Sequence, residues 1–265
     1  MYRFLLTKRW IGLALLVIVL VPTFLLLARW QWHRHLTRAT YNSAVTDNQA
    51  RATVPLEQIL APATLTDPVP ALPRADLWRN VTVTGTYLST PRPYVRRRTL
   101  NLSNGFWVIA PFVTDTGAII VVNRGWVPAV GGPATSPSVP APPTGQVTLA
   151  GRLRSSERGA TGFPADTPPD QTLALDVTQT APSGKLVFPG YLEVTTSSPA
   201  DSAVLTPIPL PELDAGPHVG YAAEWVAFAI LAIAGYFILA RKELQNIRSA
   251  QATSAVPSAA VDAAG

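Results

Sequence analysis

The chain has 265 residues, a formal net charge of +5 and a hydrophobic content of 48%. It contains no cysteine, which excludes disulfides, thiolate metal sites, thiol catalysis and a lipid anchor on cysteine. The apolar residues are gathered in two segments instead of being spread evenly, and this pattern is typical of a membrane protein.

The first apolar segment covers residues 10–28, nineteen residues without a charged side chain. At about 1.5 Å per residue, a helix of this length nearly matches a hydrocarbon core of roughly 30 Å. A cleaved signal peptide is the alternative, because Arg3, Lys8 and Arg9 precede the segment. The run is longer than the ~7–15 apolar residues of such peptides and no small-residue cleavage site follows it, so we expect the segment to stay in the membrane.

Residues 30–50 have a composition compatible with helix, and Pro55 follows them. The first helix is therefore expected to extend out of the membrane and to end before this proline. Trp30 and Trp32 stand at its exit, where indoles commonly occupy the membrane interface.

The central part of the chain contains short runs rich in Val, Ile, Thr, Tyr and Phe, bounded by turn residues, and these predict β-strands. The runs are 81–88, 106–114, 118–122, 146–153, 171–175 and 190–195. Asp115, Thr116 and Gly117 separate the second run from the third, which predicts a β-hairpin in the domain core. The Pro- and Gly-rich stretches 128–145 and 199–217 predict surface loops, because proline lacks the N–H that a strand ladder needs.

The second apolar segment covers residues 221–240 and carries one acid, Glu224, in its first turn. Arg241, Lys242 and Arg248 follow it, whereas the nearest basic residue before it is Lys185. Basic flanks stay in the cytoplasm, so both termini are predicted to be cytoplasmic and the middle of the chain to lie outside.

The predicted fold is a membrane protein in which an N-terminal and a C-terminal transmembrane α-helix flank a mainly β extracytoplasmic domain. The strands fit an antiparallel sheet that could close into a barrel, and the sequence leaves that closure open. The predicted boundaries are a cytoplasmic N-terminus at 1–9, spans at 10–28 and 218–240, the β-rich domain at 29–217 and a cytoplasmic, disordered tail at 241–265. The outer domain holds 15 Lys and Arg against 13 Asp and Glu, so a nucleic-acid partner is not indicated.

The three histidines, His33, His35 and His218, all lie within a few residues of a span on the outer side. At helical spacing His218 shares a face with Tyr221 and Trp225. An imidazole beside an apolar wall suits an axial haem ligand, and haem propionates suit arginines near the headgroups. The propionate candidates are Arg29, Arg34 and Arg124. The alternative is that His218 is an ordinary interfacial polar residue, and composition alone favours it.

Other conspicuous side chains also have two interpretations. Glu224 could face a partner inside the membrane, or it could reach interfacial water from its shallow position. Arg98, in a run of three arginines, could contact anionic headgroups or a partner, or lie on a solvated strand or loop. Arg124 and Trp126 follow a buried-looking strand, where Arg124 is expected to close a hydrogen-bond network. No hydrolase, zincin or phosphate-loop motif is present, so we assign no catalytic residue and expect no enzyme.

Four motifs, taken together, resemble the surfeit locus protein 1 family of cytochrome oxidase assembly factors. Trp30-Gln31 with Arg34 resembles the family's Trp-Gln-x-x-Arg after the first span, and residues 78–87 (WRNVTVTGTY) resemble its first strand with a Gly-x-Tyr end. Arg98, with residues 105–111 (GFWVIAP) and 120–128 (IVVNRGWVP), is similar to the family's central hairpin. Residues 218–225 (HVGYAAEW) resemble its His-x-x-Tyr-Ala-x-Gln-Trp segment, with Glu224 in place of the usual glutamine.

The resemblance implies a bacterial plasma-membrane protein that assists delivery of haem a to the catalytic subunit of cytochrome c oxidase. It further implies that His218 binds this haem. We therefore expect His218 to be the axial ligand of the haem iron or a haem-face contact, Tyr221 and Trp225 to form the apolar wall, and Arg34 and Arg124 to be propionate or partner contacts. Trp30, Gln31, Glu224, Arg98 and Trp126 are partner-binding or structural candidates. The expected partners are oxidase subunits and membrane lipid. The alternative is a non-catalytic accessory subunit that stays bound to the respiratory oxidase or supercomplex. An enzyme acting on an envelope substrate is a third hypothesis, but no nucleophile, metal cluster or acid pair supports it.

Overall fold

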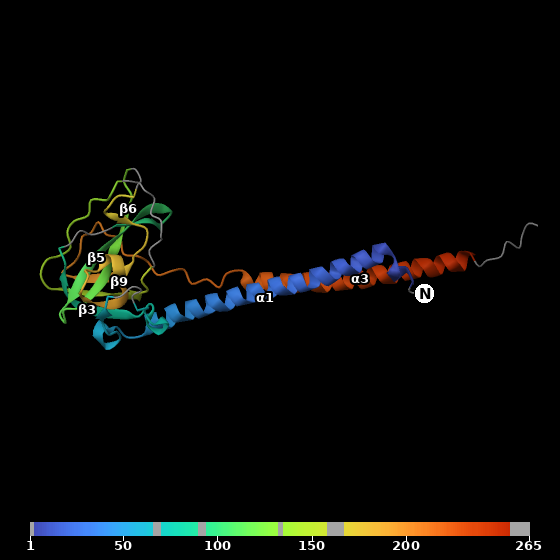
Figure 1. The fold of residues 1–265 in the computed structure, drawn as a ribbon, viewed down its shortest axis with the longest axis horizontal. Helices are drawn as coiled ribbons and strands as arrows, with labels where there is room; N and C mark the ends of the chain where they lie inside the picture. Colours follow the sequence, from blue (N-terminus) through green and yellow to red (C-terminus); the bar gives the residue numbers. More distant parts are fainter. Residues whose placement is uncertain (1–2, 66–69, 90–93, 132–134, 158–166, 255–265) are drawn as a thin grey trace, which may run out of the picture. The chain divides into compact units, whose positions relative to one another are not determined.

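The computed structural model describes residues 3–65, 70–89, 94–131, 135–157 and 167–254. The chain forms two compact units, which are described separately. The helical unit comprises Met1–Asn42 and Leu213–Gly265, and the barrel unit comprises Ser43–Glu212. Figure 1 shows the two long helices, labelled α1 and α3, and the strands of the barrel unit.

The helical unit is built on α1 (Lys8–Ala50), which continues into the barrel unit, and α3 (His218–Ser254), with a short 3-10 helix at Arg3–Leu6 before them. Within the helical unit α1 and α3 pair in opposite directions, since the ring of Trp10 meets Tyr236 at a centroid distance of 5.8 Å and the ring of Phe24 stacks on Trp225 at 5.7 Å. Pro22 lies inside α1, as a proline can within a membrane helix.

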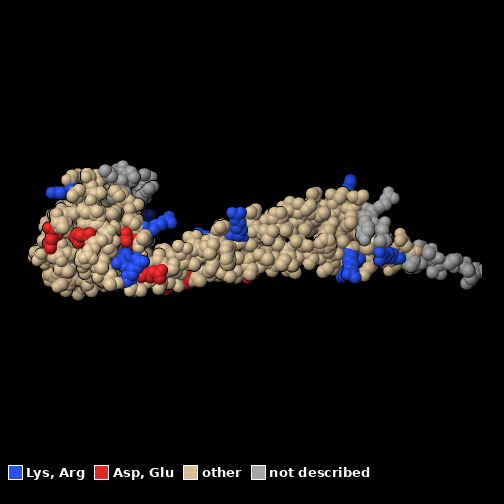
Figure 2. Space-filling view, turned by 90° about the horizontal axis from the view of Figure 1, so that it is seen from below, with Lys and Arg blue, Asp and Glu red and all other residues tan. Residues whose placement is uncertain are grey.

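Both helices are long and apolar enough to cross a membrane. Only 6% of the most apolar window of α1 and 11% of that of α3 are buried within the protein, so these side chains require an apolar surrounding. Figure 2 shows basic groups toward both ends of the helical pair and an uncharged stretch between them. This protein is accordingly a membrane protein, and α1 extends beyond its apolar segment as predicted.

The disordered tail predicted from residue 241 is wrong over its first part, because α3 continues to Ser254. The segment after Ala240 is rich in Arg, Lys, Glu, Leu, Gln and Ala, which are good helix formers, and they extend the helix beyond the apolar run. Residues 255–265 lie outside the described residues.

The barrel unit is a closed ring of five strands, which answers the question of closure that the sequence left open. In ring order the strands are β3 (Asn80–Tyr87), β5 (Ser103–Thr114), β6 (Ile119–Pro128), β9 (Leu186–Ser198) and β7 (Val147–Arg154). The ring closes because β7 pairs with β3 again. Within the ring β6 and β9 run parallel, and the other neighbours are antiparallel.

Shorter elements extend the ring. Strand β4 (Tyr94–Leu100) pairs with β5, and the two-residue strands β1 (Val54–Pro55), β2 (Ala63–Thr64) and β8 (Gln171–Thr172) pair with β3, β9 and β4 respectively. Among the described residues of this unit, single-turn helices lie at Leu56–Gln58, Arg74–Asp76 and Val177–Thr180.

Strand β6 is buried along almost its whole length because apolar clusters cover both of its faces. Ile120 and Val122 belong to one cluster with Phe112 and Leu192, whereas Ile119 and Val121 belong to a second cluster on the other face. Side chains alternate between the faces of a strand, so a strand with two covered faces reads as continuously apolar. This is why the sequence identified the central hairpin, and its turn is confirmed by the bond from the Thr114 amide to the Ala118 carbonyl at 2.8 Å.

Gly85 marks the place where β3 turns from β7 to β5 and the ring closes. It pairs with both Val147 and Thr114, and a Cβ at this position would overlap the carbonyl oxygen of Val113. Two residues on, the ring of Tyr87 meets Phe112 edge to face at 5.0 Å. The Gly-x-Tyr end of the first strand is therefore a requirement of barrel closure.

Two strand predictions need correction. Residues 94–100 form β4, which is absent from the predicted runs because three consecutive arginines break the apolar alternation; a strand was one of two alternatives for Arg98, the other being a loop. The run 171–175 pairs only at Gln171–Thr172, and Leu175 instead lies in the apolar cluster that covers one face of β6.

Candidate functional site

His218 is the first residue of α3, and Gly216 and Pro217 lead into it. Its ring is half-buried, and its Nδ1 lies 3.0 Å from Oε1 of Gln31 on α1. The structure thus brings together Gln31, from the motif that follows the first apolar segment, and His218, from the motif that leads into the second.

Trp30 and Arg34 lie on α1 next to Gln31 and are exposed. The guanidinium carbon of Arg34 is 5.9 Å from the centroid of the Trp30 ring, a distance typical of a weak cation–π contact. Arg34 is three residues from Gln31, so the two share a side of the helix. Arg34 remains accessible to an anionic group, whereas Nε of Arg29 donates to Nε2 of His33 at 3.4 Å.

Tyr221 and Trp225 follow His218 along α3 at the predicted helical spacing. Tyr221 is 47% exposed, so it offers an aromatic surface at this end of the helix. Trp225 has a different environment, since its ring stacks on Phe24 and meets Phe228 at 5.8 Å. Trp225 therefore packs in the contact between α1 and α3, in addition to its expected place in the apolar wall beside His218.

Glu224 is exposed, and the part of the chain that the structure describes gives it no ion pair. Both hypotheses for this carboxyl, a partner contact and a reach to interfacial water, therefore stay predictions.

The charge of Arg124 is already matched within the barrel unit. Its side chain is fully buried, and it donates from Nε and Nη2 to the two carboxylate oxygens of Asp201 at 2.8 and 2.6 Å. Nη2 also donates to the carbonyl of Pro140, and the guanidinium carbon lies 5.9 Å from the ring centroid of Tyr87. The interpretation as the closure of a hydrogen-bond network fits these contacts, and we do not carry Arg124 forward as a propionate contact.

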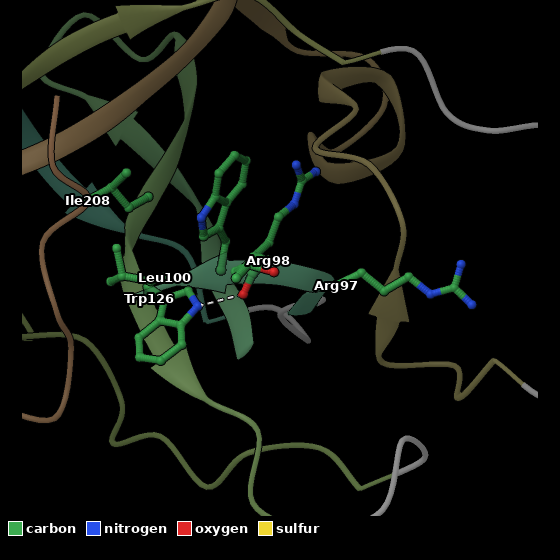
Figure 3. Close-up of a pocket in the computed structure, with 7 residues that line it drawn as sticks. Arg97, Arg98, Leu100, Trp126 and Ile208 are labelled. Atoms are coloured by element: carbon green, nitrogen blue, oxygen red, sulfur yellow. Dashed lines mark hydrogen bonds between the residues drawn. The ribbon is translucent and has the colours of Figure 1, made fainter. Parts of the chain in front are cut away.

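Arg98 and Trp126 meet in the barrel unit beside a cavity of about 240 Å³ (Figure 3). The indole Nε1 of Trp126 donates to the carbonyl of Arg98 at 2.8 Å. The guanidinium of Arg98 lies 3.9 Å from the ring centroid of Trp107 and forms an ion pair with Glu157. These contacts tie β4 to the rest of the unit and favour the structural hypothesis for both residues.

A buried charge cluster in the barrel unit was not predicted. Arg152 on β7 and Glu193 on β9 form an ion pair of 2.9 Å with both side chains almost fully buried, and Arg154 covers the ring of Trp78 at 3.4 Å. Burial lowers the pKa of Arg152 and raises the pKa of Glu193, and it raises the pKa of Tyr191 to about 12. The signal was present in the sequence as charged residues inside two otherwise apolar strands.

The chain is similar to one protein family and to several bacterial proteins. The model of the SURF1 family matches residues 18–230, a range that includes both Gln31 and His218. The chain is also 32% identical over 260 residues to uncharacterized SURF1-like proteins of Mycobacterium bovis and Mycobacterium tuberculosis, which covers 96% of this chain and 92% of each relative.

This chain belongs to the SURF1 family. The resemblance drawn from the four motifs is thereby confirmed, and with it the general role of the family in cytochrome oxidase assembly. The matched range of the SURF1 model contains the whole barrel unit and ends inside α3, so the family pattern extends over both units.

Proposed function

We propose that this SURF1-family protein receives haem a at His218 and passes it to the catalytic subunit of cytochrome c oxidase. The observation that carries the proposal is the position of His218, an imidazole held by Gln31 at one end of two paired apolar helices. Haem iron binds imidazole nitrogen, and the macrocycle requires an apolar surrounding next to cationic groups for its propionates.

The residues around His218 fit such a cargo. Tyr221 supplies exposed aromatic surface on the same face of α3, and Arg34 supplies an accessible guanidinium one turn along α1 from Gln31. His218 would bind the iron, Tyr221 and Trp225 would contact the apolar ring, and Arg34 would pair with a carboxylate. The other two histidines are less suitable, because His33 accepts from Arg29 and the Nδ1 of His35 is buried.

The proposed setting is the bacterial plasma membrane, with two spans and both termini in the cytoplasm. Arg241, Lys242 and Arg248 after the second apolar segment support this orientation, since basic flanks resist translocation. The barrel unit then lies outside the cytoplasm. Reporter fusions within loop 199–217 and at the C-terminus would test this arrangement, and a cytoplasmic barrel unit would contradict it.

The decisive test in cells is the haem a content of oxidase purified from strains that carry the wild-type factor, His218→Ala or the control His33→Ala. We expect His218→Ala to lower haem a incorporation while the amount of the factor, followed by immunoblot, stays unchanged. His33→Ala should behave as wild type. Oxidase with normal haem a content in the His218→Ala strain would contradict the proposal.

The same preparations distinguish the accessory-subunit alternative. A delivery factor should be present in far less than stoichiometric amount in mature oxidase, because it leaves once its cargo is transferred. A factor that copurifies one to one with mature oxidase, and that shows no haem absorbance when expressed alone, would favour the accessory subunit.

A further inference from the structure

The two nitrogens of the His218 ring have different surroundings. Nδ1 faces Oε1 of Gln31 at 3.0 Å. Nε2 has no hydrogen-bond partner among the described residues, and the backbone of Gly216 lies next to it. This difference matters because only the nitrogen without a proton can bind a metal.

A neutral imidazole carries its proton on one nitrogen and a lone pair on the other, and the hydrogen bond made by one nitrogen sets the state of the other. An amide oxygen can only accept, so Oε1 of Gln31 requires the proton on Nδ1. The lone pair then lies on Nε2. Partners of this kind orient metal-binding histidines and raise their basicity.

Gly216 has a φ of +64°, in the left-handed region that favours glycine. A Cβ at this position would lie 3.0 Å from Cδ2 and 3.1 Å from Nε2 of His218. Any other residue here would be strained and would also crowd the edge of the ring at Cδ2 and Nε2. The glycine therefore keeps a side chain away from the ring edge formed by Cδ2 and Nε2.

The pairing of the helices holds Gln31 opposite His218. Phe24 and Trp225 stack across α1 and α3, and each stands seven residues, about two turns, from its partner in the polar contact. Ala222, between His218 and Trp225, is buried. The aromatic stack thus fixes the register of the two helices that the Gln31–His218 contact requires.

We propose that Gln31 and Gly216 are positioning residues for His218, Gln31 by holding the proton on Nδ1 and Gly216 by leaving Nε2 uncovered for a metal centre. This inference deepens the proposed function and rests on it for the identity of the ligand. The state of the free ring, however, can be measured without any haem.

The first experiment is nitrogen NMR of the full-length, haem-free protein in detergent, labelled with ¹⁵N-histidine and held above the titration range of ordinary imidazoles. The His218 signals are identified by their loss in His218→Gln. We expect Nε2 to show the shift of an unprotonated nitrogen and Nδ1 that of a protonated one. Protonated Nε2 in the wild-type protein would overturn the proposal.

Substitutions of Gln31 sharpen this test. Gln31→Glu keeps an acceptor and should preserve the tautomer, whereas Gln31→Leu removes the acceptor and should give a mixture of both tautomers. An unchanged spectrum in Gln31→Leu would overturn the role of Gln31. If the amide instead donated to Nδ1, Gln31→Glu would move the proton, which would also contradict the proposal.

The second experiment titrates purified haem a into the same detergent samples and follows the Soret band. Gln31→Leu should weaken binding by roughly 10–100-fold, the usual effect of removing such a partner, and Gln31→Glu should restore it. Gly216→Ala should also weaken binding. Gly184→Ala is its matched control, because Gly184 has a similar φ of +74° and nothing near its Cβ position.

The two experiments separate the possible failures. If wild-type protein binds no haem a but the NMR result is as expected, the proposed function fails and the assignment of the tautomer stands. If haem a binds through His218 but Gln31→Leu and Gly216→Ala bind like wild type, the positioning roles fail and the proposed function stands.

Discussion

The barrel unit and the helical unit differ in the surroundings of the candidate side chains described above. In the barrel unit Arg124, Arg98 and Arg152 are each matched by an acid of the same unit. In the helical unit Arg34 is exposed, and His218 is held at one nitrogen while the other has no partner among the described residues. A side chain whose charge or lone pair is already used stabilises the fold, and one with an unused group is available to a ligand.

Breaking a buried ion pair of the barrel unit should lower the free energy of unfolding far more than breaking an exposed ion pair of the helical unit. Asp201→Ala leaves Arg124 as an unmatched charge with a fully buried side chain, and it should destabilise the barrel unit by about 3–5 kcal/mol. Asp214→Ala is the matched control in the helical unit. Its pair with Arg38 is 47% and 65% exposed, and exposed pairs contribute at most about 1 kcal/mol.

Thermal unfolding of the detergent-solubilised chain, followed by tryptophan fluorescence, measures both variants. Equal transition temperatures for Asp201→Ala and Asp214→Ala would show that burial of the Arg124 pair has no energetic consequence and would remove the contrast between the units.

The next largest effect is a loss of unfolding free energy at alkaline pH, which is expected to come from Tyr191 in the barrel unit. Burial raises the pKa of Tyr191 from 10.0 to about 12, so the folded state holds the phenol proton more tightly than the unfolded state. The stabilising contribution is complete below pH 10 and is lost between about pH 10 and 12. Two pKa units correspond to about 3 kcal/mol.

Tyr191→Phe cannot ionise and should flatten the dependence of the unfolding free energy on pH in this range, which denaturant titrations at several pH values can measure. If the unfolding free energy of Tyr191→Phe fell with pH as steeply as that of the wild-type protein, the loss of stability at alkaline pH would come from another group.

The smallest effect on stability is expected at Arg34, where a large effect on function is expected instead. Arg34→Gln removes an exposed charge and should change the unfolding free energy by no more than about 0.5 kcal/mol. It should lower the affinity for haem a, measured by Soret titration, because a propionate partner is lost. Affinity equal to that of wild type would exclude Arg34 from the site.

Much of the fold could be predicted from local patterns. The two apolar segments, the central hairpin and the loops have distinctive compositions, and the hairpin turn is where Asp115, Thr116 and Gly117 indicated it. Closure of the ring depends on Gly85 pairing with two strands at once, and this is a long-range property that no window of sequence displays. Strand β4 could not be distinguished from a loop for a local reason, since its arginines conceal the alternation.

The site could be predicted residue by residue but not as a contact. Gln31 and His218 were both candidates, yet they are 187 residues apart, and only the register of α1 against α3 brings them to 3.0 Å. For Arg124 the missing information was its partner, because Asp201 comes from a proline-rich loop 77 residues later. Partners contributed by irregular loops leave no periodic signal in a sequence.

The proposed function requires His218 to be a haem ligand in this protein itself. The most direct measurement is the absorbance spectrum of the protein purified in detergent from cells that make haem a, compared with His218→Ala from the same cells. The wild-type sample should show a Soret band that is lost in the variant. A wild-type sample without a Soret band, or a variant that retains the full band, would contradict the proposed function.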